Sequence, residues 1–375
     1  MKKFDEITFN GGGQELMNPM ITKVVDQINL ERKGALVKEN LGFSNTRPLS
    51  SKETYSSVNG VNELPVILEN GTKEEIELSV GPEKGYKIVE FGGKITSSFL
   101  FGEWLKNSKT LNGASDDLKA EFVNQAQKTK KLMLAADKSM ENECTKVYTL
   151  GFDITSAYWP GSATPKGQPL FSNSHTIFAT GGTFSNLVVG ALSAKTLKQA
   201  IKKHIDIRLE NGDRVNQPRT AGYTLFVSAD LEMEAREILN NGSKFAAAGA
   251  TSATENVFMF EGSRVKLEVM EKLGSYDRDW NMIGSPDMRF LVNKPALKES
   301  EAFKFIRLYS PLVKQYMNNE TDQSIVDIRN GFAVDHYGAE YFVVGSEGVD
   351  PSPSPSPSPS PSPSPSPSPS PSPNP

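Results

Sequence analysis

The chain has 375 residues, a formal net charge of −4 and 23% charged residues. Its lysines and arginines are scattered rather than gathered in a run, which argues against base-specific DNA binding. The single cysteine, Cys144, excludes an internal disulfide and a thiolate zinc cluster.

The amino-terminal residues MKKFDEITF lack the apolar stretch of a signal peptide. No segment reaches the roughly 20 apolar residues that span a bilayer. We therefore expect a protein that is made and used in a cytoplasm and has no membrane partner.

Both ends of the chain are expected to contribute little to a core. Residues 1–55 are turn-rich and indicate an amino-terminal arm that needs an outside partner, with a disordered tail as the alternative. From Pro351 the chain alternates proline and serine, and thirteen of the 24 prolines lie there. Such a segment cannot offset its ordering entropy by burial, so residues 349–375 are predicted to be an extended, unfolded tail. It is either a solvated brush on a particle exterior or a passive linker.

A β-hairpin is predicted around Asn70-Gly71, because this dipeptide supplies the positive φ angles of a two-residue turn. Its strands are residues 66–68 and 76–80, which carry many charges and few core residues, so we expect a projecting β-loop. Further extended segments are predicted at 86–91 and 94–100.

The strongest local signal predicts a helix over residues 115–144. Ser115 is a suitable N-cap, and Asp116 and Asp117 favour the first turn. About 30 residues would make a rod of roughly 45 Å. Apolar or small residues recur with helical spacing, which makes Cys144 a core thiol. They are Leu118, Phe122, Ala126, Thr129, Met133, Ala136, Met140 and Cys144.

An irregular stretch follows Gly151, and a second helix is predicted from Ser193. Leu192 and Leu197 form a hydrophobic staple around its cap, Ile201 and Ile205 are expected to point inward, and Asn211-Gly212 marks its end. The remaining predictions are a helix over 229–239, closed by Asn241-Gly242, and strands at 223–227, 257–260, 265–270, 280–283, 289–292, 303–308, 325–328 and 341–344. This mixed order predicts an α+β fold rather than a doubly wound parallel sheet.

No constellation of residues predicts catalysis, a cofactor or a metal site. His175 falls in a polar loop, His204 on a partly solvated helix face and His336 near a late strand, without metal-binding spacing. Asp277, Asp279 and Asp287 around Trp280 do not match a calcium loop and indicate a solvated turn. The glycine clusters lack a phosphate-binding pattern and are interpreted as turns and hinges. They are Gly11-Gly12-Gly13, Gly92-Gly93 and Gly181-Gly182.

A monomer would leave much of the surface of three elements exposed: the amino-terminal arm, the charged hairpin and the long helix. Each leaves surface that another subunit would have to cover, as repeated heterologous contacts do in a closed shell. The sequence therefore favours a self-assembling structural protein over an enzyme.

Several short segments resemble the Mu-like major head subunit family of tailed phages, which has the Hong Kong 97 phage-type capsid fold. The most specific is GQPLFSNSH at residues 167–175, followed by SNL at 185–187 and ALS at 191–193. A further match covers residues 225–239, where Ser228-Ala229 replaces the usual proline pair. The resemblance spans roughly residues 85–348 in element order, and residues 165–240 carry its motifs.

This resemblance implies a set of roles for the segments of the chain. They are an N-arm (1–55), an E-loop β-hairpin (56–92), a peripheral domain (93–180 and 311–348) with a spine helix (115–144), an axial domain (181–310) and the Pro-Ser tail (349–375). Some phages of this fold link subunits through a lysine–asparagine bond. Lys73, Lys84 and Lys87 lie in the loop, and we assign no cross-link to them.

The resemblance also implies a function. The chain would assemble from pentamers and hexamers into an icosahedral shell around double-stranded phage DNA, without catalytic residues or cofactors. It would be part of the virion, assembled in the host cytoplasm. Its implied partners are itself, a separate scaffolding protein, a portal and a maturation protease, with non-specific contact to packaged DNA.

The sequence leaves three other interpretations of the protein's function open. An encapsulin-like bacterial compartment shell has a similar fold but encloses enzymes instead of DNA. Pro-Ser repeats also link surface or carbohydrate-associated domains, although these require export. An enzyme with an unrecognised site is the third.

Overall fold

The computed structural model describes most of the chain between residues 40 and 348. The described residues are 40–46, 52–55, 83–96, 116–154, 163–177, 182–209, 214–215, 222–240, 243–244, 254–255, 265–318 and 323–348. Most of the predicted arm, the hairpin around Asn70-Gly71, the strand at 257–260 and the Pro-Ser tail lie outside them.

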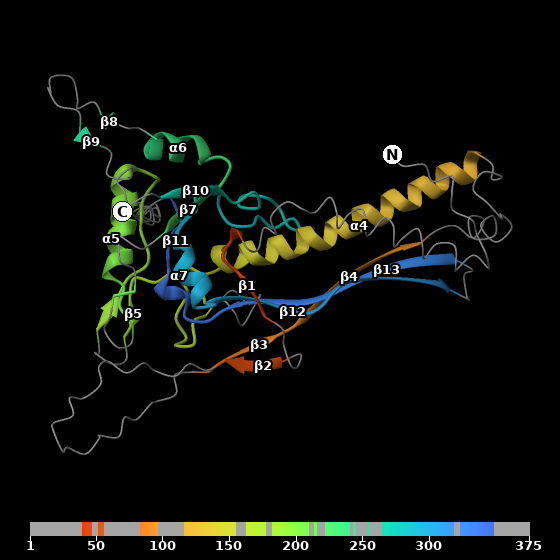
Figure 1. Ribbon diagram of the computed structural model, residues 1–375, viewed down its shortest axis with the longest axis horizontal. Coiled ribbons are helices and arrows are strands. Elements are labelled where there is room, and N and C mark those ends of the chain that lie inside the picture. The colour runs from red at the N-terminus through yellow and green to blue at the C-terminus, as the bar shows by residue number, and fades with distance from the viewer. Residues whose placement is uncertain are drawn as a thin grey trace, which may run out of the picture.

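A long helix and a long β-hairpin form an elongated arm (Figure 1). Helix α4 has 34 residues and packs on β13 and β4. At 1.5 Å per residue the helix measures about 51 Å, and the hairpin strands of 14 and 16 residues reach a similar length. The sheet has the order β1-β12-β13-β4, and β1 is parallel to β12. The elements are α4 (Asp116–Thr149), β1 (Ser44–Thr46), β4 (Val89–Thr96), β12 (Phe303–Asn318) and β13 (Gln323–His336).

The buried face of α4 follows the predicted spacing. Thr129, Met133, Met140 and Cys144 are all buried, which confirms the core position of the thiol. The helix continues five residues past the predicted end, because Tyr148 adds one more buried position to the same face. The side chains of the stripe before Thr129 lie outside the described residues.

A second, more compact region is built on the sheet β10-β7-β11-β14 (Figure 1). All residues of β7, β11 and β14 are buried. β10 is parallel to β7, and the other pairs are antiparallel. The strands are β7 (Tyr223–Val227), β10 (Lys266–Val269), β11 (Arg289–Asn293) and β14 (Val343–Ser346), and the helices around them are α5 (Ala194–Asp206), α6 (Glu232–Asn240) and α7 (Lys294–Glu299).

Shorter elements complete the described structure. They are the antiparallel pairs β2 (Lys52–Tyr55) with β3 (Lys84–Lys87), β5 (His175–Thr176) with β6 (Thr183–Phe184) and β8 (Ser243–Lys244) with β9 (Thr254–Glu255), and a 3₁₀ turn, η4 (Ala339–Tyr341). These elements and the two main sheets confirm the predicted α+β class. Across the described ranges, no helix is both long and apolar enough to cross a membrane.

Several predicted boundaries were wrong for local reasons. The helix after Ser193 ends at Asp206, because Ile207 turns extended and buries its side chain completely. Residues 280–283 form a turn instead of a strand, since Trp280 has a φ of 62°. Helix α6 begins three residues later than predicted, and the predicted strand at 341–344 starts with η4. The segments 303–308 and 325–328 are parts of much longer strands.

Tyr148, near the end of α4, joins the two sheets. Its ring lies 4.9 Å from Phe303 of the arm sheet and 5.1 Å from Phe290 of the compact sheet, centroid to centroid. Its hydroxyl donates a 2.7 Å hydrogen bond to the Leu41 carbonyl. Burial raises the pKa of Tyr148 well above its usual value. The arm and the compact region therefore share one aromatic core.

We expect truncation of Tyr148 to be among the most destabilising single changes. Tyr148→Ala should lower the free energy of unfolding by about 3–5 kcal/mol, as large core deletions do, and Tyr148→Phe by about 1–2 kcal/mol for the lost hydrogen bond. Tyr276→Phe is the control, because that ring is 49% exposed. Urea unfolding measures all three, and equal losses for Tyr148→Phe and Tyr276→Phe would contradict the assignment.

Candidate functional site

The motif residues meet at the completely buried side chain of Asn186. Its Oδ1 accepts hydrogen bonds from the Ser172 amide at 2.8 Å and from His175 Nε2 at 3.0 Å. Its Nδ2 donates to the Leu170 carbonyl at 2.7 Å and to the Glu340 carbonyl at 3.2 Å. This polar centre, Asn186 with its four partners, holds together segments that are up to 154 residues apart in the sequence.

The proton positions at this polar centre follow from its acceptors. Carbonyl oxygens can only accept, so the Asn186 amide nitrogen must face them and its oxygen must face the His175 ring. His175 Nε2 therefore carries a proton. Burial lowers the pKa of His175 to about 4, although its hydrogen bonds oppose this shift. The ring is neutral near pH 7 and serves as a fixed donor.

The structure corrects two of the histidine predictions. His175 is 1% exposed and begins strand β5 instead of lying in a polar loop. His204 is completely buried, and its Nε2 donates to the Leu291 carbonyl at 2.8 Å. The spacing of Leu197, Ala200 and His204 places all three on the buried face of α5. That spacing was the available signal, and counting Ile201 and Ile205 as the inward residues missed it.

The three histidines occupy separate environments. His336 ends β13, is buried and packs edge-on to Phe303 with ring centroids 6.2 Å apart. His204 lies against β11, and His175 belongs to the polar centre. Among the residues that the structure describes, no group of three or more His, Cys, Asp or Glu side chains could hold a metal ion.

Lys84, one of the three loop lysines, is part of a buried ion pair. Its Nζ lies 2.7 Å from Asp335 Oδ1 and donates to the His336 carbonyl at 2.7 Å. Burial raises the pKa of Asp335, and the ammonium of Lys84 acts in the opposite direction. The contact ties β3 to the end of β13. Lys73 and the side chain of Lys87 lie outside the described residues.

The aspartates around Trp280 do not form one cluster. Asp279 faces solvent and pairs with Arg278, as expected for a solvated turn. Asp277, in contrast, is 10% exposed and lies 3.2 Å from Lys146 of α4. Its Oδ1 also accepts the backbone amides of Asp279 and Asn281 at 2.9 Å. This turn is therefore fixed to α4 and holds Trp280 81% exposed.

The Gly92-Gly93 pair is not a hinge as predicted. Both residues lie within strand β4, opposite Arg329 and Ile328 of β13. A Cβ atom at Gly93 would come within 3.0 Å of the Leu132 side chain of α4. The absence of side chains lets the helix approach the sheet closely.

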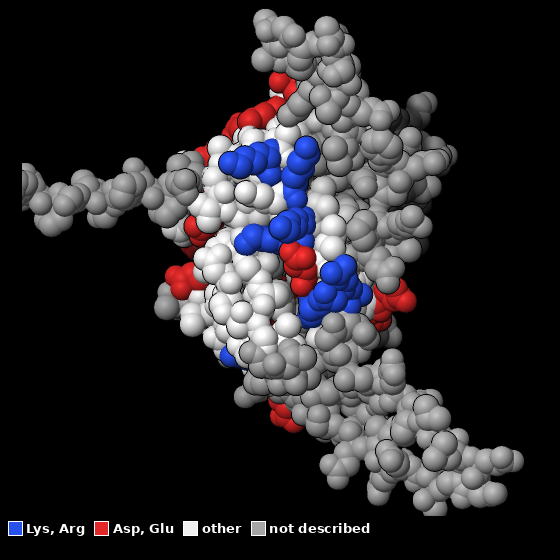
Figure 2. Space-filling view, turned by 90° about the vertical axis from the view of Figure 1, so that its left-hand side faces the viewer, with Lys and Arg blue, Asp and Glu red and all other residues white. Residues whose placement is uncertain are grey.

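Charged side chains are unevenly distributed on the surface. Lysine and arginine side chains gather on the face that includes α5 (Figure 2). Lys195, Lys198 and Lys202 of α5 are all exposed. The chain as a whole is acidic, so this local excess of positive charge is a feature of one face only.

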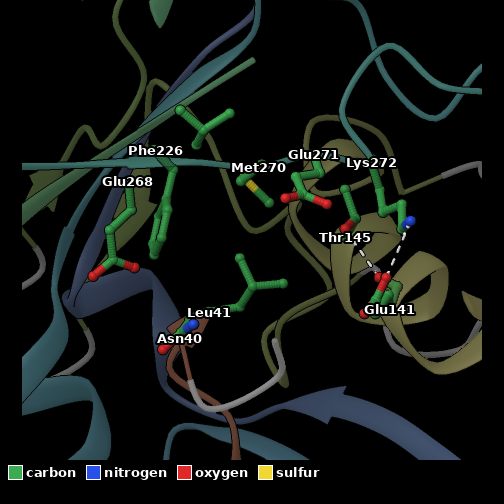
Figure 3. Close-up of a pocket in the computed structure, with 10 residues that line it drawn as sticks. Asn40, Leu41, Glu141, Thr145, Phe226, Glu268, Met270, Glu271 and Lys272 are labelled. Atoms are coloured by element: carbon green, nitrogen blue, oxygen red, sulfur yellow. Dashed lines mark hydrogen bonds and ion pairs between the residues drawn. The ribbon is translucent and has the colours of Figure 1, made fainter. Parts of the chain in front are cut away.

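A pocket of about 300 Å³ lies between the end of α4 and β10 (Figure 3). Glu141 is paired with Lys272 at 3.1 Å, and Glu268 is paired with Lys294 at 2.7 Å. Two of its three carboxylates, those of Glu141 and Glu268, are therefore paired with lysines. Its lining residues are Asn40, Leu41, Glu141, Thr145, Phe226, Glu268, Val269, Met270, Glu271 and Lys272.

No family profile matches this chain. No curated protein matches it. The similar solved structures include the capsid of cyanophage P-SCSP1u, with a TM-score of 0.47, 9% identity and coverage of 92% of both chains. The capsid of a native GTA particle has a TM-score of 0.47 and 7% identity, and covers 84% of this chain and 91% of its own. The capsid of Myoviridae phage XM1 has a TM-score of 0.42 and 12% identity, and covers 83% and 92%. Likeness at this distance does not assign a function.

We predict that the polar centre depends on the amide of Asn186. Asn186→Asp places a carboxylate oxygen against two carbonyl oxygens and leaves them without a donor, which should cost about 2–5 kcal/mol of unfolding free energy. Asn173→Asp is the matched control, because Asn173 is exposed in the same segment. Thermal unfolding of both variants tests this, and similar melting temperatures for the two would contradict it.

Acid should destabilise the fold through its buried histidines. Burial lowers the pKa of His204 to about 4, as it does for His175, against about 6.5 in the unfolded chain. The unfolded state therefore binds more protons between pH 6.5 and pH 4. The stability contributed by neutral burial is complete above pH 6.5 and is lost on acidification, by up to about 1.4 kcal/mol per pH unit for each ring.

His204→Gln isolates one of these rings, because glutamine can still donate to the Leu291 carbonyl but does not titrate. Unfolding free energies at pH 7.5 and pH 5 should differ less for His204→Gln than for the wild type. An unchanged difference between the two pH values would show that His204 does not contribute.

Proposed function

We propose that this chain is the major capsid protein of a tailed phage, a structural subunit of the Hong Kong 97 phage type that assembles into a shell around double-stranded DNA. The observation that carries the proposal is the elongated arm, in which one helix and one long hairpin run side by side (Figure 1). The order of the sequence motifs supports the same assignment.

The arm is a long helix on a narrow sheet, and parts of its outer strands remain exposed. Along β4, exposed residues alternate with half-buried ones, so α4 covers one face of this strand. Val89 and Leu308 are 37% and 45% exposed on the arm sheet. A helix on a narrow sheet leaves much surface in solvent for each residue that it buries. Such a shape suits a subunit that is covered by its neighbours.

We assign the structural roles of the chain within this proposal. Most of the arm corresponds to the peripheral domain (93–180 and 311–348), and β7, β10 and β11 with α5 and α6 belong to the axial domain (181–310). The compact sheet is completed by β14, which the chain reaches after it has returned to the peripheral domain. The segments 1–55 and 56–92 are the N-arm and the E-loop, and residues 349–375 are the tail. The proposed partners are copies of the chain, a scaffolding protein, a portal, a maturation protease and packaged DNA.

Electron microscopy and analytical ultracentrifugation of the purified chain, with and without a co-expressed scaffolding protein, test this function. We expect hexamers, pentamers or closed shells, because the arm needs neighbours to cover it. Particles that contain genome-length DNA would favour a phage capsid over an enzyme-packing compartment. A compact monomer under every assembly condition would contradict the proposal.

A further inference from the structure

An exposed tryptophan lies in the segment between β10 and β11. Residues 276–282, here called the Trp280 turn, are closed by an antiparallel bridge between Tyr276 and Met282. Trp280 is 81% exposed, and Tyr276 and Met282 are about half exposed. The ring centroids of Tyr276 and Trp280 lie 6.4 Å apart. Large apolar side chains that adjoin one another in solvent are typical of an interaction site.

The Trp280 turn is held in one conformation. Asp277 Oδ1 accepts the backbone amides of Asp279 and Asn281, each at 2.9 Å. The other carboxylate oxygen of Asp277 lies 3.2 Å from Lys146 Nζ, and both side chains are nearly buried. The turn is thereby fixed to α4. A side chain on a fixed backbone loses little conformational entropy when it binds, which favours its use as an anchor.

The backbone at Trp280 is strained. Its φ of 62° brings a side chain close to its own backbone, so this conformation favours glycine and is rare for a bulky residue. The neighbouring positive φ angles, 78° at Gly274 and 69° at Gly284, are indeed taken by glycine. A tryptophan at the third such position lowers the stability of the isolated subunit. Strain of this kind is concentrated at functional positions.

The chain also carries a pocket that suits an indole ring. The pocket between the end of α4 and β10 has a volume of about 300 Å³. A cavity of about 150 Å³ is large enough for benzene. Leu41, Phe226 and Met270 supply apolar surface to the pocket (Figure 3). Glu271 is exposed beside them, and its carboxylate can accept a hydrogen bond from an indole N–H, which needs a partner when it is buried.

The ring and the pocket of one copy are held apart. The exposure of Trp280 shows that its ring lies outside its own pocket. Glu141 of α4 pairs with Lys272 at the pocket, and Lys146 of α4 pairs with Asp277 in the turn. Both surfaces are therefore attached to the same helix and keep their positions. A subunit that presents an exposed ring and a pocket of sufficient size is complementary to a second copy of itself.

We propose that Trp280 of one copy inserts into the pocket between α4 and β10 of a second copy. This inference deepens the proposed capsid function and rests on it. The indole ring would pack on Leu41 and Met270, whose thioether favours aromatic contacts, and its N–H would donate to Glu271. A buried tryptophan in a pocket of the partner is a common energetic centre of an interface.

Trp280→Gly removes the anchor without straining the subunit. Glycine adopts a positive φ readily, so this variant should be folded and as stable as the wild type in urea unfolding. Its association should be about 30-fold weaker, measured by sedimentation, because a central anchor is lost. Met233→Ala is the control, since Met233 is exposed on α6, outside the turn and the pocket. An equal loss in the control would overturn the proposal.

Filling the pocket should have the same effect as removing the ring. Val269 lines the pocket, so Val269→Phe reduces its volume and should weaken association at least tenfold. The double variant Trp280→Gly/Val269→Phe should associate no more weakly than Trp280→Gly, because no ring is left to be excluded. Losses that multiply would show that the two sites do not meet. If circular dichroism shows that Val269→Phe is unfolded, Glu271→Trp fills the same pocket from an exposed position.

The fluorescence of Trp280 reports on its environment directly. The chain has three tryptophans, and Trp104→Phe/Trp159→Phe leaves Trp280 as the only one. We expect its emission to move to shorter wavelength, and iodide quenching to fall, as the concentration is raised through the association range. Adding Val269→Phe should abolish both changes. A ring that stays exposed to iodide in the associated protein would contradict the contact.

The remaining outcomes also decide between partners. If monomers already show the shifted emission, a segment of the same chain covers the ring and the proposal is wrong. A shift that appears only with a co-expressed scaffolding protein would assign the turn to that protein instead. If the wild type assembles and Trp280→Gly assembles equally well, the contact is wrong while the capsid function stands. If the wild type never associates, both fail.

Discussion

The arm and the compact region depend on the last turns of α4, where Tyr148 lies between two sheets. Phe43, Phe226, Phe290 and Phe303 surround its ring, and its hydroxyl holds the Leu41 carbonyl. Neither sheet buries this cluster alone. The long arm keeps a fixed orientation relative to the compact region only if the contact between them is tightly packed. Closely packed aromatic rings provide such a contact.

The polar centre has a complementary role in the compact region. A buried amide with both of its ends satisfied specifies one arrangement of the chain, because any displacement of Ser172, Leu170 or Glu340 leaves a donor or acceptor unpaired. Asn186 also receives a backbone hydrogen bond from Gly345 on its own carbonyl, at 2.9 Å. It thereby attaches the loop before α5 to β14. The sequence motif around residues 167–187 thus contains the residues that fix this part of the fold.

Local signals predicted the elements that are decided locally. The periodicity of α4 and the short apolar strand β7 were recognisable, as was the start of α5 at Ser193. The buried state of His204 was missed because its hydrogen-bond acceptor, the carbonyl of Leu291, is 87 residues away in the sequence. The length of β12 and β13 was missed for the same kind of reason, since polar residues such as Lys314 and Asp327 stay in the ladder through their partner strand. Trp280 forms a turn because Asp277 binds the backbone amides around it.

The distribution of polar contacts separates the parts of the molecule that must stay fixed from those that are available for assembly. Four basic side chains point inward, where their charged groups bind polar groups of the same chain. They are Lys84, Lys146, Lys203 and Arg289. Burying these charged groups costs desolvation free energy, and the contacts that they make favour a single conformation of the chain. Lys195, Lys198 and Lys202 of α5 are instead exposed and retain their long-range field. Under the proposed capsid function, a subunit that is rigid inside can meet its neighbour without reorganising, which keeps the free-energy cost of each assembly step low.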